Sequence, residues 1–273
     1  MVDKARSGFS LMEVLVVTAT VSLVMAVTMP AITAARSQAR AIVCRSNLRQ
    51  LVLANMGYTN DNDGFCVPAA EDFWVTVGML QGGYCRWHGK RTGPDEPFDP
   101  LKGPLVGYLS DGQVKECPAR VEFIKDQPGN VNFELGCGGY GYNMVYIGSR
   151  MSVPGLGYKR KYAETARAEM IRKPEETLMF ADCAMAVANG RYIEYSFAEP
   201  PYFLINGMVH EDMLSSPSIH FRHRGLANVG WSDGHIESRP MANMDVDNIY
   251  GVASASMNLG WFEPVNNTLF DLE

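Results

Sequence analysis

The sequence lacks the signatures of several common catalytic and binding sites. It contains no P-loop and no nucleophile elbow of the Ser-His-Asp type. Its six cysteines include no C-x-x-C pair, which excludes the usual zinc-ribbon and thioredoxin motifs, and they are too few for a disulfide scaffold. A basic excess is also missing, because 24 Lys and Arg face 30 Asp and Glu. We therefore expect no enzyme activity, no cofactor, no metal and no nucleic-acid partner.

The composition is that of a chain that can fold. Its 273 residues are 47% hydrophobic, which suffices for a buried core. The 26 glycines and 15 prolines place much of the chain in turns and argue against a small all-helical bundle. No internal repeat is present.

One long segment carries no ionisable side chain. Residues 14–35 would extend roughly 33 Å as a helix, which is the thickness of a membrane. A buried core helix would normally show a polar face, and only scattered serine and threonine interrupt this run. A cleaved secretory signal is the other alternative, but Ala39-Arg40-Ala41 matches its cleavage pattern only formally. We expect a membrane-spanning helix.

The residues before this segment resemble the processing signal of the type IV pilin-like family, which includes the pseudopilins of type II secretion. The match is Gly8-Phe9-Ser10-Leu11-Met12-Glu13 behind a short basic leader. The resemblance implies cleavage between Gly8 and Phe9 by a prepilin peptidase and N-methylation of Phe9. It also implies that the apolar segment stays on the mature protein.

Glu13 stands at the threshold of the apolar segment, where an unpaired carboxylate is costly. Cleavage would create an ammonium group at Phe9, and that of a neighbouring subunit could neutralise Glu13. This pairing makes Glu13 the expected assembly residue, although a charge reaching the membrane surface is the simpler interpretation. Pro30 should kink or loosen the span.

Arginines follow the apolar segment at positions that share one side of a continuing helix: Arg36, Arg40, Arg45 and Arg49. Their position beyond the span favours a cytoplasmic C-terminal part by the positive-inside tendency. The family resemblance implies the opposite, a single-pass inner-membrane protein with an extracytoplasmic head. We follow the resemblance on this point.

Turn-forming residues at 57–64 predict the end of the helix and a domain boundary. We therefore expect a leader at 1–8, a transmembrane and stem helix at 9–60, and a head at 61–273. The acidic turn does not fit an EF-hand, because Ala70 falls where the bidentate acid is needed. Calcium binding outside that motif stays open.

The expected fold is α+β, with the long helix packed on a mainly antiparallel sheet. A short amphipathic helix is predicted at 72–81. Asp233-Gly234 predicts a hairpin turn. Strands are predicted at 114–117, 141–147, 177–181, 192–197, 218–223, 227–232 and 235–238.

A second resemblance lies near the C-terminus, where His223, nine residues, and then Asp233-Gly234 match the signature of an H-x9-D-G subfamily of pilin-like proteins. Fragments such as Cys117-Pro118 and the run from Thr177 to Asp182 are similar to the same subfamily. A metal held by the nearby histidines is the chemical alternative, with His220, His223, Asp233 and His235 as ligands. Strand alternation argues against it, because side chains three apart point to opposite faces.

Disulfides are permitted if the head is extracytoplasmic. Six cysteines allow 15 full pairings, and the sequence does not choose among them. We place Cys44–Cys117 first, since it would tie the stem to the head, and Cys66–Cys85 second; for Cys183 we prefer a buried thiol.

The leading hypothesis is a structural pilin or pseudopilin subunit. Its expected partners are homologous subunits, the prepilin peptidase that also methylates it, and inner-membrane lipid; its final location would be a filament. A membrane-tethered module that binds glycans through tryptophans is the alternative, and an anchored metal hydrolase is the third. The tryptophans are Trp74, Trp87, Trp231 and Trp261.

Overall fold

The computed structural model describes residues 10–73, 83–93, 96–119, 121–124, 135–187 and 190–273. The chain divides into two units, Met1–Ala39 and Arg40–Glu273. The division falls inside the first helix, not at its end. The second unit therefore contains the last part of the stem predicted at 9–60.

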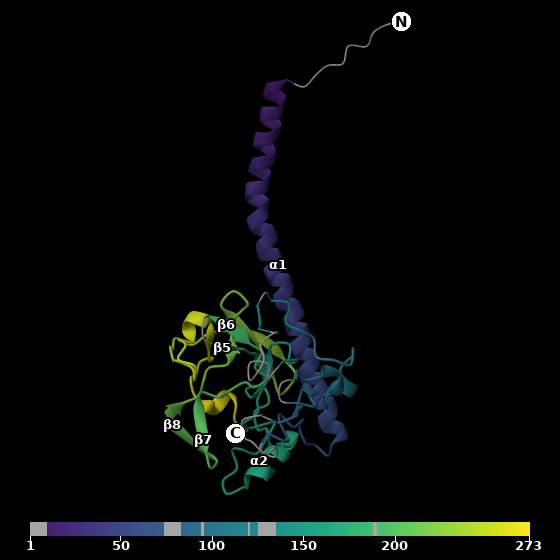
Figure 1. Ribbon diagram of the computed structural model, residues 1–273, viewed down its shortest axis with the longest axis vertical. Helices are drawn as coiled ribbons and strands as arrows, with labels where there is room; N and C mark the ends of the chain where they lie inside the picture. Colours follow the sequence, from purple (N-terminus) through teal and green to yellow (C-terminus); the bar gives the residue numbers. More distant parts are fainter. Residues whose placement is uncertain (1–9, 74–82, 94–95, 120, 125–134, 188–189) are drawn as a thin grey trace. The chain divides into compact units, whose positions relative to one another are not determined.

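Helix α1 runs from Leu11 to Asp61 and continues through Pro30 without a break (Figure 1). It ends at Asp61, one residue beyond the helix end predicted at 60, and Asp63 and Gly64 in the following turn take left-handed backbone conformations. A second, short helix, α2, spans Tyr158–Ala163.

Among the described residues, each ladder between two strands is antiparallel, and two isolated bridges, Phe123–Tyr192 and Tyr142–Phe197, are parallel. The largest sheet has the order β11-β10-β4-β3. Four two-stranded sheets, β1-β2, β5-β6, β7-β8 and β9-β12, accompany it. An α+β fold with a long N-terminal apolar helix and antiparallel sheets is thus confirmed. The strands are β1 Cys85–Arg86, β2 Gly89–Lys90, β3 Tyr140–Tyr142, β4 Leu178–Asp182, β5 Met185–Val187, β6 Arg191–Ile193, β7 Tyr202–Ile205, β8 Met208–Leu214, β9 Ile219–His220, β10 Leu226–Trp231, β11 Ile236–Pro240 and β12 Leu259–Gly260.

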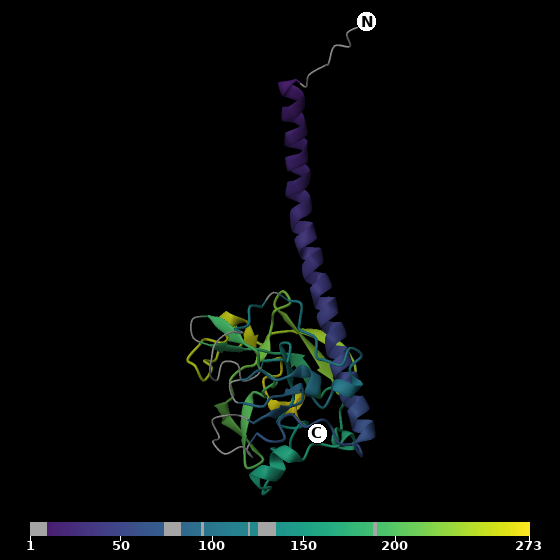
Figure 2. The same cartoon turned by 45° about the vertical axis from the view of Figure 1, so that its right-hand side comes forward.

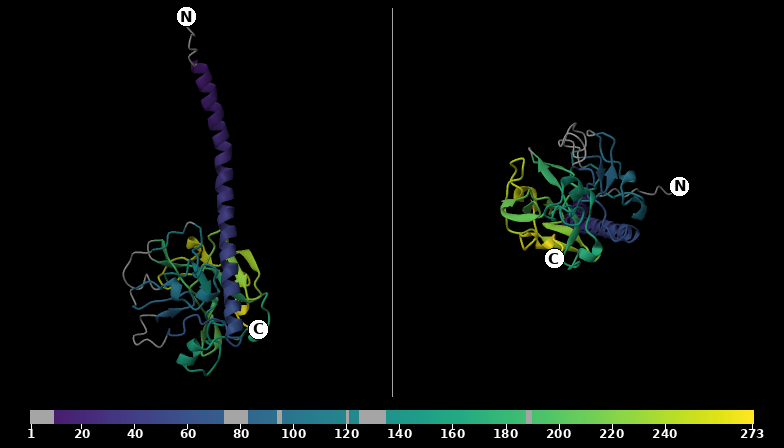
Figure 3. Two further views of the ribbon diagram at one scale, coloured as in Figure 1. Left: turned by 90° about the vertical axis from the view of Figure 1, so that its right-hand side faces the viewer. Right: turned by 90° about the horizontal axis from the view of Figure 1, so that it is seen from below.

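The core of the second unit forms between the end of α1 and the large sheet, and the views in Figures 2 and 3 agree that this part of α1 lies along one side of the unit. Leu48 and Val52 of α1 are fully buried in the same cluster as Tyr142 and Phe180 of the sheet. A buried amide fixes the contact, because the Asn55 side chain donates to the Tyr142 hydroxyl and accepts from the backbone N–H of Val67. Burial of the apolar face explains why the compact unit begins within the helix.

Gly230 in β10 allows α1 to approach the sheet. A Cβ atom at this position would lie 2.7 Å from Cγ2 of Val52 and 3.0 Å from Cδ1 of Ile236. The helix backbone could not pack at this distance over a larger residue.

The hairpin predicted at Asp233-Gly234 is confirmed, since β10 and β11 pair around it and Gly234 has a φ of 98°. Several other strand predictions are wrong in extent. The predicted strand at 141–147 ends at Tyr142, because the Asn143 side chain bonds the backbone of Leu178, Phe270 and Tyr146 and turns the chain. Those at 192–197 and 218–223 shrink to β6 and β9.

No strand forms at 114–117, where the chain has no regular secondary structure. The amide of Cys117 donates to the carbonyl of Gly138, but among the described residues no strand pairing includes this segment. The helix predicted at 72–81 lies mostly outside the described residues; Glu71–Phe73, at its start, form a turn.

The β7-β8 hairpin was not predicted, although its turn is Asn206-Gly207. Both residues have positive φ, 52° and 81°. This pair is the strongest short-range hairpin signal, because a type I′ turn needs left-handed backbone at both central positions.

Candidate functional site

The start of α1 is organised by a capping box. Ser10 precedes the helix, and both its backbone N–H and its hydroxyl donate to Oε2 of Glu13, at 2.8 and 2.9 Å. The amide of Glu13 donates in turn to the Ser10 hydroxyl at 3.3 Å. The Ser-x-x-Glu spacing that specifies this motif was present in the sequence and was overlooked. Gly8 and Phe9, the predicted processing residues, lie outside the described residues.

The segment of α1 that follows, residues 14–35, is apolar on its whole circumference apart from scattered serine and threonine. Its threonines donate their hydroxyls to carbonyls three or four residues earlier, as Thr18 does to Leu15 and Thr33 does to Met29. These bonds satisfy the polar groups inside the helix. The most apolar window has a mean hydropathy of 2.1, and none of it is buried, so α1 is long and apolar enough to span a membrane.

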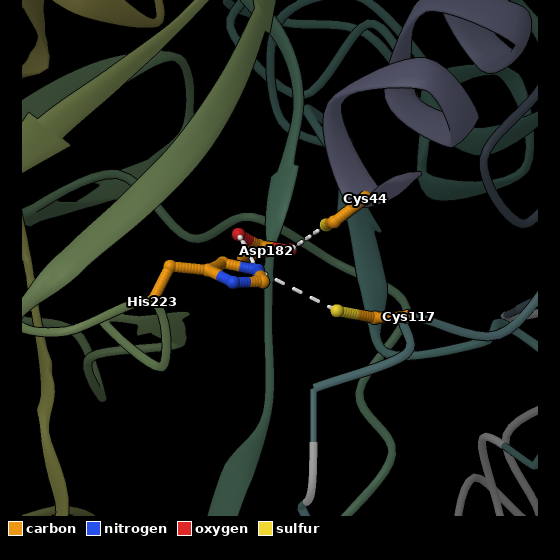
Figure 4. A group of neighbouring side chains, drawn as sticks. All are labelled: Cys44, Cys117, Asp182 and His223. Atoms are coloured by element: carbon orange, nitrogen blue, oxygen red, sulfur yellow. Dashed lines mark hydrogen bonds and ion pairs between the residues drawn. The ribbon is translucent and has the colours of Figure 1, made fainter. Parts of the chain in front are cut away.

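A second group of functional side chains lies in the compact unit, where four segments far apart in the sequence meet (Figure 4). Cys44 comes from α1, Cys117 from the loop before β3, Asp182 from the end of β4 and His223 from the turn after β9. One side-chain donor atom from each lies within 4.8 Å of the others. We call these four residues the Cys-Asp-His cluster.

The contacts within the Cys-Asp-His cluster are direct. The thiol of Cys44 donates to Oδ1 of Asp182 at 3.0 Å, and Nε2 of His223 lies 3.3 Å from Oδ2 of the same carboxylate. Sγ of Cys117 lies 3.6 Å from the same Nε2. Cys44 and Asp182 are fully buried, whereas Cys117 retains 9% exposure.

Two further groups hold the Asp182 carboxylate from outside the cluster. The backbone N–H of Asn228, in the adjacent strand β10, donates to Oδ2 at 2.8 Å. The buried guanidinium of Arg222 places Nε 3.9 Å from Oδ1 and donates through Nη2 to the carbonyls of Gly139 and Cys183. The carboxylate is therefore fixed in position by the sheet and balanced by a buried cation.

The surroundings separate the pKa values of the cluster. Burial raises the pKa of the Cys44 thiol. A hydrogen bond with Cys44 lowers the pKa of the Cys117 thiol to about 5, although burial acts in the opposite direction. Burial opposes the charge on Asp182 and His223, but Arg222 holds the pKa of Asp182 below its usual value. Hydrogen bonds with Asp182 and Cys117 raise the pKa of His223 to about 9. Without a metal, the cluster at neutral pH is thus a buried network of balanced charges.

The geometry does not support a Cys-His-Asp catalytic triad. A triad needs the thiol and the carboxylate on opposite ring nitrogens, so that the imidazole can take a proton on one side while it is held on the other. Here Cys117 and Asp182 both approach Nε2 of His223. The thiol and the carboxylate therefore lie on the same side of the imidazole, and the ring does not stand between them as in a triad.

The metal site considered from the sequence is not formed. Of its four residues only His223 joins the cluster; His220 stacks on Tyr192 with ring centroids 4.7 Å apart. Asp233 and His235 pair with each other at 2.6 Å on the hairpin turn, where they are partly exposed. The H-x9-D-G residues therefore have two separate positions, His223 in the cluster and Asp233-Gly234 at the turn.

The cysteine predictions have a mixed outcome. No disulfide joins the described cysteines, so neither predicted disulfide is present, but Cys44 and Cys117 do meet in the Cys-Asp-His cluster. Cys66 is buried in the core, while Cys85 lies in β1. Cys183 is a fully buried thiol, as expected.

Asp182 was not selected from the sequence as a site residue. Asp182 directly follows the apolar run Leu-Met-Phe-Ala of β4. This position indicates a buried carboxylate, which needs a hydrogen-bonding or charged partner. The tryptophans proposed as binding platforms have a different role, since Trp87, Trp231 and Trp261 are buried; Trp74 lies outside the described residues.

No family model, curated protein or solved structure matches this chain.

Proposed function

We propose that the protein is a structural subunit of the pilin or pseudopilin type, which is stored in the membrane and assembled through α1 into a filament. The observation that carries the proposal is the stretch of α1 at residues 14–35, an uncharged and exposed apolar surface that begins directly after Glu13 of the Gly8–Glu13 sequence. Such a surface needs lipid before assembly and sister helices after it, because exposed apolar area of this extent is unfavourable in water.

Glu13 supplies the specificity of assembly in this proposal. Among the described residues the hydrogen bonds of its carboxylate both use Oε2, which leaves Oε1 for an ammonium group from another chain. Cleavage after Gly8 would create that group at Phe9. Pairing the two charges removes the cost of a carboxylate in an apolar environment, so the favoured register is the one in which they meet.

The alternative of a tethered glycan-binding module loses its main support, because the three described tryptophans are core residues. The proposed location is a single-pass inner-membrane protein with an extracytoplasmic head, and then a filament. The proposed partners are homologous subunits, the processing peptidase and membrane lipid.

The test uses the full chain in its own cells. We expect sheared filaments to contain a form that begins at methylated Phe9, by intact mass and N-terminal peptide analysis. Glu13→Ala should be processed and inserted but should lose incorporation into filaments, because the ammonium group of the next subunit would have no partner.

Ser10→Ala is the matched control, since it removes the two hydrogen bonds of the Ser10 hydroxyl and leaves the carboxylate. It should weaken the helix start by about 1 kcal/mol and keep incorporation. Mature protein that begins at Met1, or filaments with a normal content of the Glu13→Ala chain, would refute the proposal.

A further inference from the structure

We propose that the Cys-Asp-His cluster is a structural zinc site, in which Cys44, Cys117, His223 and one oxygen of Asp182 bind the ion. The inference does not depend on the filament proposal, since it concerns only residues of the compact unit. The bound zinc ion would link the stem helix, the end of β4 and two loops.

The spacing of the donor atoms suits a tetrahedral ion. Zinc bonds of 2.0–2.3 Å place neighbouring ligand atoms about 3.3–3.8 Å apart at tetrahedral angles. In the cluster, Sγ of Cys44 lies 3.0 Å from Oδ1 of Asp182, Nε2 of His223 lies 3.3 Å from Oδ2 of the same carboxylate, and Sγ of Cys117 lies 3.6 Å from that Nε2. One donor atom from each of the four residues lies within 4.8 Å of the other three. Small movements of side chains would bring them onto one ion.

The donor types select the metal. Two sulfurs, one imidazole nitrogen and one carboxylate oxygen form a borderline-soft set, which favours zinc over the oxygen-seeking calcium and magnesium ions. Four protein ligands fill a tetrahedral shell. The site is therefore expected to be structural, because a catalytic zinc keeps one position for water or substrate.

The surroundings meet the further needs of a zinc site. Asn228 donates its backbone N–H to the Asp182 carboxylate and would orient this ligand. Two thiolates, a carboxylate and a divalent ion leave one negative charge, which the buried Arg222 beside Asp182 would balance. Cys117, with 9% of its surface exposed, is the most accessible of the four ligands.

A disulfide between Cys44 and Cys117 is the competing use of the same sulfurs. It would explain two of the four residues and would leave unexplained why His223 and Asp182 approach the same space. Zinc uses all four, and binding requires only that protons leave the ligands.

The experiment measures the metal content of the full chain, purified in detergent without added chelator. We expect one zinc ion per chain, which is retained through gel filtration and released when a mercurial reagent blocks the thiols. Replacing zinc by Co²⁺ should give the absorbance of a thiolate-bound tetrahedral ion. This spectrum is measured on the unmodified chain, so it does not depend on whether a variant folds.

Variants then assign the ligands. Cys117→Ser and His223→Gln should lose the bound zinc. In the Co²⁺ measurement, Cys117→Ser should also show a weaker thiolate-to-cobalt band. Cys183→Ser, a buried thiol outside the cluster, and His235→Gln, a partly exposed histidine, are the matched controls and should keep the metal. A Cys44–Cys117 disulfide in the isolated protein would overturn the inference. So would a reduced chain that takes up no zinc or Co²⁺, or equal zinc in the ligand variants and the controls.

Discussion

Replacing Asp182 by asparagine would keep the shape of the side chain and remove its charge. Asparagine can still accept the backbone N–H of Asn228. It cannot balance the guanidinium of Arg222, whose side chain is only 2% exposed, or the imidazolium of His223. Removing one partner of a buried charge pair costs about 3–5 kcal/mol, and we expect a loss of unfolding free energy of this size in the metal-free chain.

The assay is urea unfolding of the full chain in detergent with a chelator present, followed by tryptophan fluorescence. The exposed carboxylate of Asp212 provides the control, since its side chain is 84% exposed. Asp212→Asn should change the unfolding free energy by less than about 0.5 kcal/mol. The m-value should be the same for both variants and the unmodified chain, because the fold is retained.

A double-mutant cycle with Arg222→Met separates the charge pair from general damage. The two substitutions together should cost less than the sum of their separate costs, because the second removes the charge that the first left unpaired. A loss below about 1 kcal/mol for Asp182→Asn, or strictly additive costs in the cycle, would refute the assignment of Asp182 as the buried counter-charge.

Two further predictions concern the compact unit. Burial holds the pKa of His220 well below its usual value, so the folded chain resists protonation of this side chain. The free energy of unfolding should therefore fall as the pH drops below about 6.5, by up to about 1.4 kcal/mol per pH unit. Urea unfolding at several pH values should show a weaker pH dependence for His220→Phe. Leu48→Ala removes a fully buried side chain between α1 and the sheet and should cost about 2–5 kcal/mol, whereas Leu53→Ala, at a position 50% exposed, should cost far less; similar losses at both positions in thermal unfolding would contradict the packing described for α1.

Some of the fold could be predicted because the information is local. The apolar run, the turn after α1 and the hairpin at Asp233-Gly234 each depend on a few consecutive residues, and the structure contains all three elements. The Ser10 capping box and the Asn206-Gly207 turn also depend on a few consecutive residues, although neither was predicted. The strand at 114–117 was predicted wrongly for a different reason, because a strand exists only where another segment offers it a ladder.

The sequence alone thus determined the long apolar helix and its start, since helix capping and hydropathy act between near neighbours. Only the tertiary structure brought Cys44, Cys117, Asp182 and His223 together, from a helix, a loop, a strand end and a turn. Which cysteine meets which histidine is decided by how the helix and sheet pack, because ligand groups separated by many residues come together only when the core between them forms.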